Sequence, residues 1–529
     1  MEQQGAKRRR VKPEKYSSEQ SVSNREEELY QQAIANSRQE KSLPKLPIPE
    51  APTFRPTKQE FERPLEFIEK IRPEAEKFGI CCIVPPPEFA HECCVDFSNE
   101  KKFSTKLQRI ERLQESVPYE EGRKYALMDY KAMADNFLDA WVKDHDAENM
   151  ETEYWRLVDG CAEPCTVEYG NDVDTEEYGS GFPCKDKTNP WNLNVLPKTS
   201  LLRHFEISMK GINAPWLYLG MLFSTFSWHT EDNFLASINY LHMGAPKQWY
   251  GVPGSHATAF ENVVRRFYKQ RLMEVPDLLH NLNTMFSPSK LKALQVPVFR
   301  LVQKPGMFVV TYPQAFHSGF SYGFNCGEAV NFATSNWIRF ASLAAERYRR
   351  IGRLAVFSHD RLIFTLAKQI DTFSDNHAEC LLLQQELEKI CKEELTLRPR
   401  LYESGVRDVS GLIAPPKNTD KIDNAASDYD DKRVCVVCRH TCFCSAVACN
   451  CSQTQVVCLR HAAYLCKCPA QNKYLIEWES NENLEKLLKK VDDAIHAKFT
   501  SVLNPLRKPN LSSASDQEQK EPQATTPTT

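Results

Sequence analysis

The sequence predicts an α+β protein with a β-rich centre, helical segments on either side of it, and a small cysteine-rich module near the end. Between about 165 and 345 the chain consists of short apolar runs separated by Gly and Pro, which is typical of a β-barrel or sandwich. Later stretches such as LLLQQELEKICKEEL have helical periodicity. Nine of the 19 cysteines fall between Cys435 and Cys468. For this length we expect about two to four folded units.

The first 44 residues are polar and charged, and their composition predicts a disordered tail. The tail contains the basic run KRRRVKP (7–13), which resembles a nuclear-import signal. Such runs are also common as solvated charge clusters, so the run alone leaves both interpretations open.

The ordered chain is expected to begin with a helix and a strand. Thr57 is a candidate N-cap for a helix that Pro64 and Pro73 interrupt. A short strand is expected at 80–84, where three prolines end it. A second helical segment is expected at about 120–145.

After the β-rich region the chain is expected to be helical as far as a polar linker at 415–433, which precedes the cysteine cluster. A further helix should follow the cluster, and the last 20 residues are rich in Ser, Gln, Pro and Thr and are expected to be disordered. The expected apolar face of that last helix consists of Leu484, Leu487, Leu488, Val491 and Ile495.

Charge and hydropathy exclude some classes of protein. A formal net charge of -3 argues against a globally cationic protein, so any contact with nucleic acid would be local. No stretch approaches about 18 consecutive apolar residues, and the N-terminus has no apolar signal core, so we expect neither a membrane span nor secretion. In such a chain, dense cysteines accompanied by a histidine indicate bound zinc rather than disulfides.

The tripeptide His229-Thr230-Glu231 and the later His317, in FHSGF, carry the most specific chemistry. Two imidazoles and one carboxylate can occupy one face of an octahedral metal and leave the other positions open, as in non-haem Fe(II) oxygenases. On a strand His229 and Glu231 would project to the same face. The tripeptide alone is weak evidence, because cupin-like barrels also hold manganese or zinc with similar ligands.

Lys247 is a candidate partner for an anionic cosubstrate. It follows a turn at 244–246. Ser237 and Asn239 lie an even number of residues after His229 and Glu231, so on a strand without a bulge they would project to the same face. A buried cation near a metal is costly unless it meets an anion, which would fit a dicarboxylate such as 2-oxoglutarate. An exposed lysine at a strand end is the alternative.

The surrounding segments resemble a known family. SWHTEDNFLASINYLHMGAPKQWYGVPGSHA and FVVTYPQAFHSGFSYGFNCGEAVNF resemble the Jumonji-C oxygenases, LPIPEAPTFRPTKQEFERPLEFIEKI…FGICCIVPPPEF resembles the Jumonji-N segment, and CVVCRHTCFCSAVACNCSQTQVVCLRHAAYLCKC resembles the C5HC2 finger. In this order they are similar to histone H3 lysine-4 demethylases of the retinoblastoma-binding-protein-2 class. The resemblance covers about 45–500.

The resemblance implies a double-stranded β-helix, the jelly-roll or cupin-like barrel, for the catalytic domain. The expected units are the disordered basic tail (1–44), the Jumonji-N segment (45–95), a helical bridge (96–164), the catalytic barrel (165–345), a helical region with its linker (346–433), the zinc finger (434–470), a C-terminal helical segment (471–505) and a disordered tail (506–529). The ARID and PHD modules of the animal members, which would fall near 100–125, are absent from this chain.

The resemblance also implies a role for each candidate site residue. His229, Glu231 and His317 would hold Fe(II). Lys247 and Tyr169 would bind the distal carboxylate of 2-oxoglutarate. Tyr218 would face the methylated lysine, and the cosubstrate would be lined by Phe226, Ser237, Asn239 and Trp249. Without the family pattern, core packing would be the ordinary interpretation of each aromatic residue. Ser321 departs from the pattern, because the class usually has Asn there, near the cosubstrate.

The cysteine cluster is expected to bind two structural zinc ions. Guided by the family, we pair Cys435 and Cys438 with Cys458 and His461 in one tetrahedral site. The second site would consist of Cys449, Cys451, Cys466 and Cys468. Exchange of a ligand with Cys442 or Cys444 stays open. A site in which four protein ligands fill the tetrahedron leaves no open position on the metal, and this favours a structural role over an independent activity.

These expectations combine into a nuclear Fe(II)- and 2-oxoglutarate-dependent demethylase acting on lysine 4 of the histone H3 tail in nucleosomes, within a co-repressor complex. Alternatives are a demethylase for lysine 9 or 36 and a catalytically weak chromatin scaffold. The lysine-9/36 class carries a pair of zinc-binding cysteines after the barrel, whereas ERYRRIGRLAVFSHD contains none. Ala329 also fits the lysine-4 class better. Whether the finger contacts DNA stays open.

Overall fold

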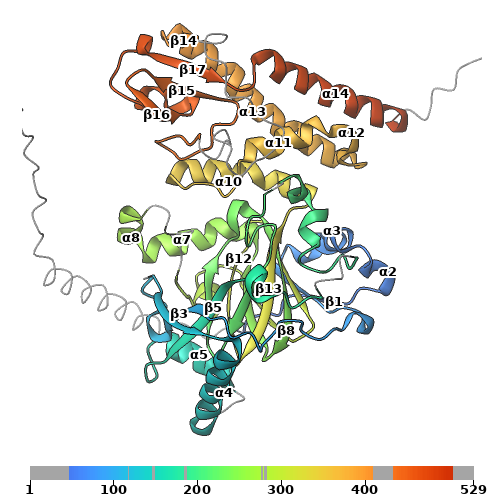
Figure 1. The fold of residues 1–529 in the computed structure, drawn as a ribbon, viewed down its shortest axis with the longest axis vertical. Coiled ribbons are helices and arrows are strands. Elements are labelled where there is room, and N and C mark those ends of the chain that lie inside the picture. The colour runs from blue at the N-terminus through green and yellow to red at the C-terminus, as the bar shows by residue number, and fades with distance from the viewer. Residues whose placement is uncertain are drawn as a thin grey trace, which may run out of the picture.

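Two mainly antiparallel sheets face each other in the part of the molecule that forms the lower half of Figure 1. The computed structural model describes residues 47–503 except 117, 146–148, 184–187, 206, 276–277, 279–282 and 409–432. The large sheet has the order β1 (Thr53–Phe54), β2 (Ile80–Ile83), β11 (Phe308–Thr311), β8 (Ala236–Gly244), β13 (Asn325–Phe332), β6 (Trp216–Gly220), β5 (Thr166–Asp174), β3 (Phe103–Arg109) and β4 (Glu120–Tyr125). The small sheet has the order β10 (Phe299–Gln303), β9 (Lys247–Val252), β12 (Phe316–Ser321) and β7 (Thr225–His229).

Alternation along the strands separates the core from the cavity. On β8, Ile238 and Tyr240 are buried against the first helices, whereas Ser237 and Asn239 line a cavity between the sheets. Only the β1–β2 pair within these two sheets is parallel. The jelly-roll prediction for the β-rich region, in a chain that is α+β overall, is confirmed.

The N-terminal helices cover the outer face of the large sheet. A capping box at Thr57 begins the short helix α2 (Lys58–Phe61), in which Thr57 and Glu60 bond reciprocally. Pro64 opens α3 (Pro64–Ala75), where its missing N–H is harmless. Phe67 and Ile68 of α3 are buried against β8 and β11. Thr57 is therefore the N-cap that the sequence predicted.

The expected helical bridge at 96–164 is wrong in its first half. Strands β3 and β4 lie there and extend the large sheet beyond β5, and the helices α4 (Leu127–Asp144) and α5 (Met150–Val158) come only afterwards. The expected helix at 120–145 therefore begins at Leu127. Free backbone groups along β5 pair with β3, and this pairing overrides the helix-like spacing of the sequence.

The remaining barrel helices are short. They are α6 (Thr175–Tyr178), α7 (Ala257–Phe267), α8 (Lys269–Glu274) and α9 (Pro288–Ala293). Phe260 of α7 stacks on Phe316 of β12, with ring centroids 4.2 Å apart, so α7 covers the outer face of the small sheet.

A helical layer lies at one end of the barrel, and the sheet of the cysteine-rich module, here called the finger sheet, lies beyond it (Figure 1). The helices are α10 (Ile338–Ile351), α11 (His359–Lys368), α12 (Ile370–Phe373), α13 (His377–Glu403) and α14 (Asn481–Leu503). The apolar face predicted for the last helix packs against α11 and α13, with Leu484 and Val491 fully buried. The finger sheet has the order β14 (Arg407–Asp408), β17 (Lys473–Glu477), β15 (Ser445–Cys449) and β16 (Ser452–Val457).

The expected zinc-finger boundary at 470 is too early. Strand β17 lies beyond it but pairs with β15, so the finger sheet continues into the segment expected to be helical. The two terminal tails, the basic run at 7–13 and most of the linker fall outside the described residues. Among the residues that the structure describes, no helix has the length and apolar character needed to span a bilayer.

Candidate active site

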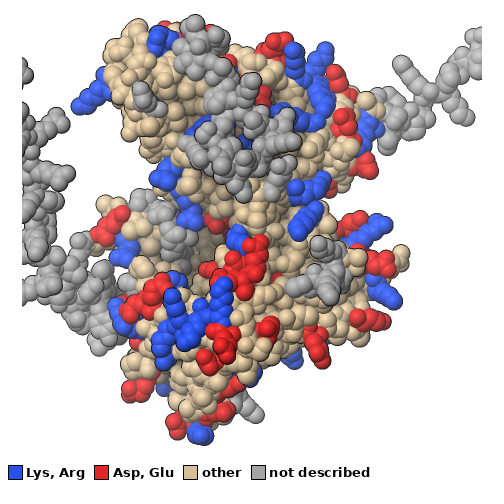
Figure 2. All heavy atoms as spheres, viewed as in Figure 1, with Lys and Arg blue, Asp and Glu red and all other residues tan. Residues whose placement is uncertain are grey.

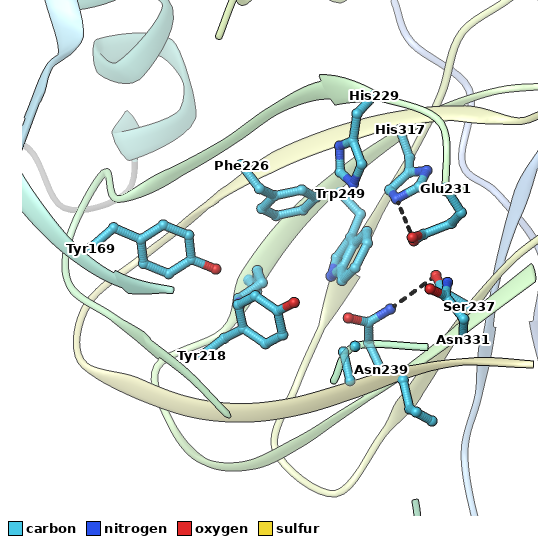
Figure 3. A pocket seen from close by; sticks show the side chains of 14 residues that line it. Tyr169, Tyr218, Phe226, His229, Glu231, Ser237, Asn239, Trp249, His317 and Asn331 are labelled. Carbon is cyan, nitrogen blue, oxygen red and sulfur yellow. Dashed lines mark hydrogen bonds and ion pairs between the residues drawn. The ribbon is translucent and has the colours of Figure 1, made fainter. Parts of the chain in front are cut away.

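His229, Glu231 and His317 converge at one end of the cavity between the sheets (Figure 3). His229 ends β7, and His317 lies directly opposite it on β12. One ligand atom from each of the three side chains lies within 4.8 Å of the others, and the Nε2 atom of His317 is 3.3 Å from a Glu231 oxygen. Two paired strands fix the histidines and Glu231 follows just after β7, so the three groups form a set that can bind one metal ion from one side.

Backbone and side-chain contacts orient these three ligands. The Nδ1 atom of His229 is 2.7 Å from the Ser227 carbonyl oxygen, and that of His317 is 3.2 Å from the Ala315 carbonyl oxygen. With Nδ1–H donating to these carbonyls, each ring keeps Nε2 as its free acceptor. A hydrogen bond from Asn331 on β13 holds the Glu231 carboxylate.

The protonation states suit a divalent cation. Burial, with a further contribution from His317, lowers the pKa of His229 to about 4, so its ring is neutral at physiological pH. Burial alone would raise the pKa of Glu231, but the hydrogen bond from His317 and the charges of both histidines lower it to about 2. A neutral imidazole, as at His229, and an ionised carboxylate, as at Glu231, are forms that bind metals, so the set fits Fe(II).

A buried cation lies elsewhere in the same cavity. Lys247 begins β9 and is only 6% exposed. Its Nζ atom is 5.9 Å from the ring centroid of Tyr169 and 5.8 Å from that of Phe226. Among the described residues, no carboxylate forms an ion pair with it, and burial lowers its pKa to about 8. The interpretation of Lys247 as an exposed strand-end lysine is therefore wrong. An uncompensated cation inside a cavity fits an anionic ligand.

Aromatic residues form the wall between the metal ligands and the opposite end of the cavity. The ring centroid of Trp249 lies 6.1 Å from that of His317, in a stacked arrangement, and 4.6 Å from that of Phe226, in a tilted one. The indole N–H of Trp249 donates to the side-chain oxygen of Gln303 at 2.9 Å. At the opposite end the rings of Tyr169 and Tyr218 lie 6.4 Å apart, with both hydroxyls directed into the cavity (Figure 3).

A second pair of candidate metal sites lies in the cysteine-rich module. One group comprises Cys435, Cys438, Cys458 and His461, and the other comprises Cys449, Cys451, Cys466 and Cys468. Within each group the ligand atoms lie within 4.8 Å of one another. Cys442 and Cys444 are buried and belong to neither group. The structure therefore gathers the sets proposed from the sequence, without exchange.

Comparison with protein families assigns the three parts of the chain. The family model "JmjC domain, hydroxylase" matches residues 216–332, which contain all three metal-ligand candidates and Lys247. The chain contains a JmjC domain. The jmjN domain matches residues 52–85, and the C5HC2 zinc finger matches residues 435–487. The cofactors that these domains imply are Fe(II) and 2-oxoglutarate in the JmjC domain and zinc in the finger.

Three curated relatives of this chain come from plants. It is 34% identical to "Putative lysine-specific demethylase JMJ16" of Arabidopsis thaliana over 86% of this chain and 44% of that protein. It is 34% identical to "Lysine-specific demethylase JMJ703" of Oryza sativa subsp. japonica over 86% of this chain and 42% of that protein. For "Lysine-specific demethylase JMJ17" of Arabidopsis thaliana the identity is 38%, over 68% of this chain and 31% of that protein. The chain thus spans less than half the length of these relatives.

All ten JmjC residues proposed from the sequence line this one cavity, but some details of the expectation were wrong. Strand β7 ends at His229, so Glu231 lies beyond it rather than on the same strand. The turn Asp232–Phe234, with positive φ at Asn233 and Phe234, then separates Glu231 from β8. Ser237 and Asn239 nevertheless line the cavity, because β8 begins after this turn at a position from which their side chains project toward the cavity.

The sequence reasoning missed Asn331, and it placed Ser321 too close to the cosubstrate. Asn331 is a cavity residue that contacts Glu231, although 100 positions separate the two residues. Ser321 does not line the cavity. Its hydroxyl is buried without a partner among the described residues and lies against Gly220, where a Cβ atom would approach it to 2.5 Å. The departure at Ser321 therefore changes packing between the two sheets, beside Gly220 of β6, rather than the cavity wall.

Proposed function

We propose that this protein is an Fe(II)- and 2-oxoglutarate-dependent lysine demethylase that acts on lysine 4 of histone H3 in the nucleus. The observation that carries the proposal is the combination, in one cavity, of three metal-ligand candidates with Lys247, which is buried and forms no ion pair with any described residue. Few ligands need both groups at once; a dicarboxylate that also chelates a metal is one of them.

The chain's own residues supply position and charge. His229, Glu231 and His317 would hold Fe(II), and Lys247 with Tyr169 would hold the distal carboxylate of 2-oxoglutarate. When bound, the metal and 2-oxoglutarate would activate O₂, so that an N-methyl group is hydroxylated while 2-oxoglutarate is oxidised to succinate and CO₂; the hydroxylated methyl carbon then leaves as formaldehyde. Phe226 and Trp249 would exclude water from the cosubstrate, and Tyr218 would aim the methylated side chain at the metal.

Methyl-lysine as the substrate is supported by the named relatives, two of which are lysine-specific demethylases and one putatively so. Lysine 4 is supported by the domain order, by Ala329 in the cavity wall and by the lack of a cysteine pair in the segment 346–360. A co-repressor complex as partner rests on the family resemblance alone. Figure 2 shows charges of both signs interspersed over the barrel, and any DNA contact would be local.

A demethylase for another histone lysine is the second candidate, and a peptide panel separates the two. We expect the protein to remove methyl groups from histone H3 peptides trimethylated at lysine 4, while peptides methylated at lysine 9 or 36 stay unchanged by mass spectrometry. Faster reaction at lysine 9 or 36 would overturn the assignment to lysine 4 and leave the oxygenase chemistry intact. Methyl removal from none of the peptides, despite bound iron, would favour the scaffold interpretation.

A further inference from the structure

The strand β5 contains a bulge directly beside the proposed methyl-lysine end of the cavity. Gly170 pairs with Leu219 and Val173 pairs with Leu217, so two residues of β5, Asn171 and Asp172, lie opposite the single residue Tyr218 of β6. Asp172 has a φ of 56°, in the left-handed region that few residues other than Gly, Asn and Asp adopt. Bulges next to active sites commonly redirect a side chain, and here the redirected side chain is a carboxylate.

The Asp172 carboxylate is held by its two neighbours. The Tyr218 hydroxyl donates a hydrogen bond to it, and the Asn171 side-chain amide donates another at 2.6 Å. The Tyr218 oxygen itself lines the cavity (Figure 3). Because its proton is given to Asp172, this oxygen presents only lone pairs to whatever occupies the cavity.

The carboxylate has no cationic partner of its own. Asp172 lies at the exposed rim, but protein surrounds its carboxylate, and this partial desolvation raises its pKa although hydrogen bonds from Tyr218 and Asn171 lower it. The positive charge of Lys106 acts on it, but Lys106 is itself paired with Glu121 at 2.5 Å. In the described part of the chain, no Lys or Arg forms an ion pair with Asp172. Among the described residues, the carboxylate beside Tyr218 is therefore not neutralised by an ion pair.

We propose that Asp172 is a positioning residue that makes this end of the cavity selective for the positive charge of a methylated ammonium group. It acts through Tyr218, by fixing the hydroxyl proton away from the cavity so that the phenolic oxygen faces the cation. The inference rests on the proposed function, because it names what the same cavity recognises.

The test compares a charged ligand with a neutral one of the same shape. We use a histone H3 peptide trimethylated at lysine 4 and a second peptide in which a carbon atom replaces the quaternary nitrogen. Binding to the full chain, supplied with Fe(II) and 2-oxoglutarate without oxygen, is measured by calorimetry, so that no turnover is needed. The variant is Asp172→Asn, since Asn tolerates a positive φ and keeps the shape of the side chain. The matched control is Glu176→Gln, which removes a charge just beyond β5 from a side chain that is 71% exposed and paired with Lys210.

The wild-type protein and the Glu176→Gln variant should bind the charged peptide about 10-fold more tightly than the neutral one, as expected for a charge interaction at short range in a partly desolvated site. Asp172→Asn should reduce this preference to less than about 2-fold, mainly by weakening binding of the charged peptide. In a Tyr218→Phe background the same substitution should have little further effect, because the hydroxyl that transmits it is gone.

Three results would overturn the proposal. A preference unchanged by Asp172→Asn would show that the carboxylate plays no part. An equal effect in the Tyr218→Phe background would show that Asp172 does not act through Tyr218. Failure of the wild-type protein to prefer the charged peptide would remove the selectivity itself, and failure to bind either peptide would also remove the proposed function.

Discussion

Replacement of Lys247 with methionine is expected to weaken binding of 2-oxoglutarate by about two to three orders of magnitude while stabilising the protein that has no cosubstrate. Loss of one member of a buried charge pair costs about 3–5 kcal/mol, and each 1.4 kcal/mol corresponds to about tenfold in affinity. In the protein without cosubstrate the substitution should increase the free energy of unfolding, since the Lys247 ammonium is buried without an ion-pair partner among the described residues.

The stabilisation should depend on pH in a definite direction. Burial lowers the pKa of Lys247 from 10.5 to about 8, so below pH 8 the lysine is charged in both the folded and the unfolded protein and the full penalty is present. Between pH 8 and 10.5 the folded protein loses the proton first, and the penalty disappears. The gain in the free energy of unfolding for Lys247→Met is therefore largest below pH 8, at most about 3 kcal/mol, and vanishes above pH 10.5.

Calorimetry with 2-oxoglutarate and Fe(II) under anaerobic conditions measures the first effect, and thermal unfolding of the protein alone measures the second. Lys304→Met is the matched control, because it makes the same chemical change at an exposed position of the same barrel and should alter neither quantity. Unchanged affinity in Lys247→Met would contradict the carboxylate assignment. A lower melting temperature at neutral pH would contradict an uncompensated buried charge.

Loss of a ligand from the first zinc site is expected to destabilise the helical layer as well as the finger. Cys435, Cys438, Cys458 and His461 hold the segments that carry His440 and Arg460. His440 is 3.4 Å from Asp360 of α11, and Arg460 pairs with Glu393 of α13 at 2.5 Å. Zinc binding supplies about 10–16 kcal/mol in small fingers, so these contacts should be lost together with the metal.

The two zinc sites should therefore respond differently to the same substitution. Cys438→Ser should increase hydrogen exchange in α10, α11 and α13, whereas Cys451→Ser, at an exposed position of the second site, should affect mainly the finger. Metal analysis should find two zinc ions per wild-type chain. Equal protection of the helices in the two variants would contradict the view that the first site anchors the finger to the helical layer.

The sequence was most informative where the chemistry is local. Thr57 and Glu60 form their capping box within one helical turn, and the last helix buries the apolar face that its spacing predicted. The three metal-ligand candidates and Lys247 were found because the residues flanking them resemble a family, rather than because His-X-Glu is itself distinctive.

Contacts between distant segments could not be predicted in this way. Strand β3 forms because β5 offers free backbone groups, which the spacing of its own residues does not reveal. Asn331 reaches Glu231 only because β13 crosses the barrel beside β8. The left-handed backbone at Asp172 likewise depends on a register shift between β5 and β6, so a sequence pattern that favours a strand at 166–174 gives no sign of it.

Formaldehyde release from a histone H3 peptide trimethylated at lysine 4 tests the central claim most directly. With Fe(II), 2-oxoglutarate and oxygen, the wild-type protein should release formaldehyde and succinate in equal amounts as methyl groups disappear from the peptide. His229→Ala, which removes one metal ligand, should release neither. Release of no formaldehyde by wild-type protein that retains bound iron would contradict the account.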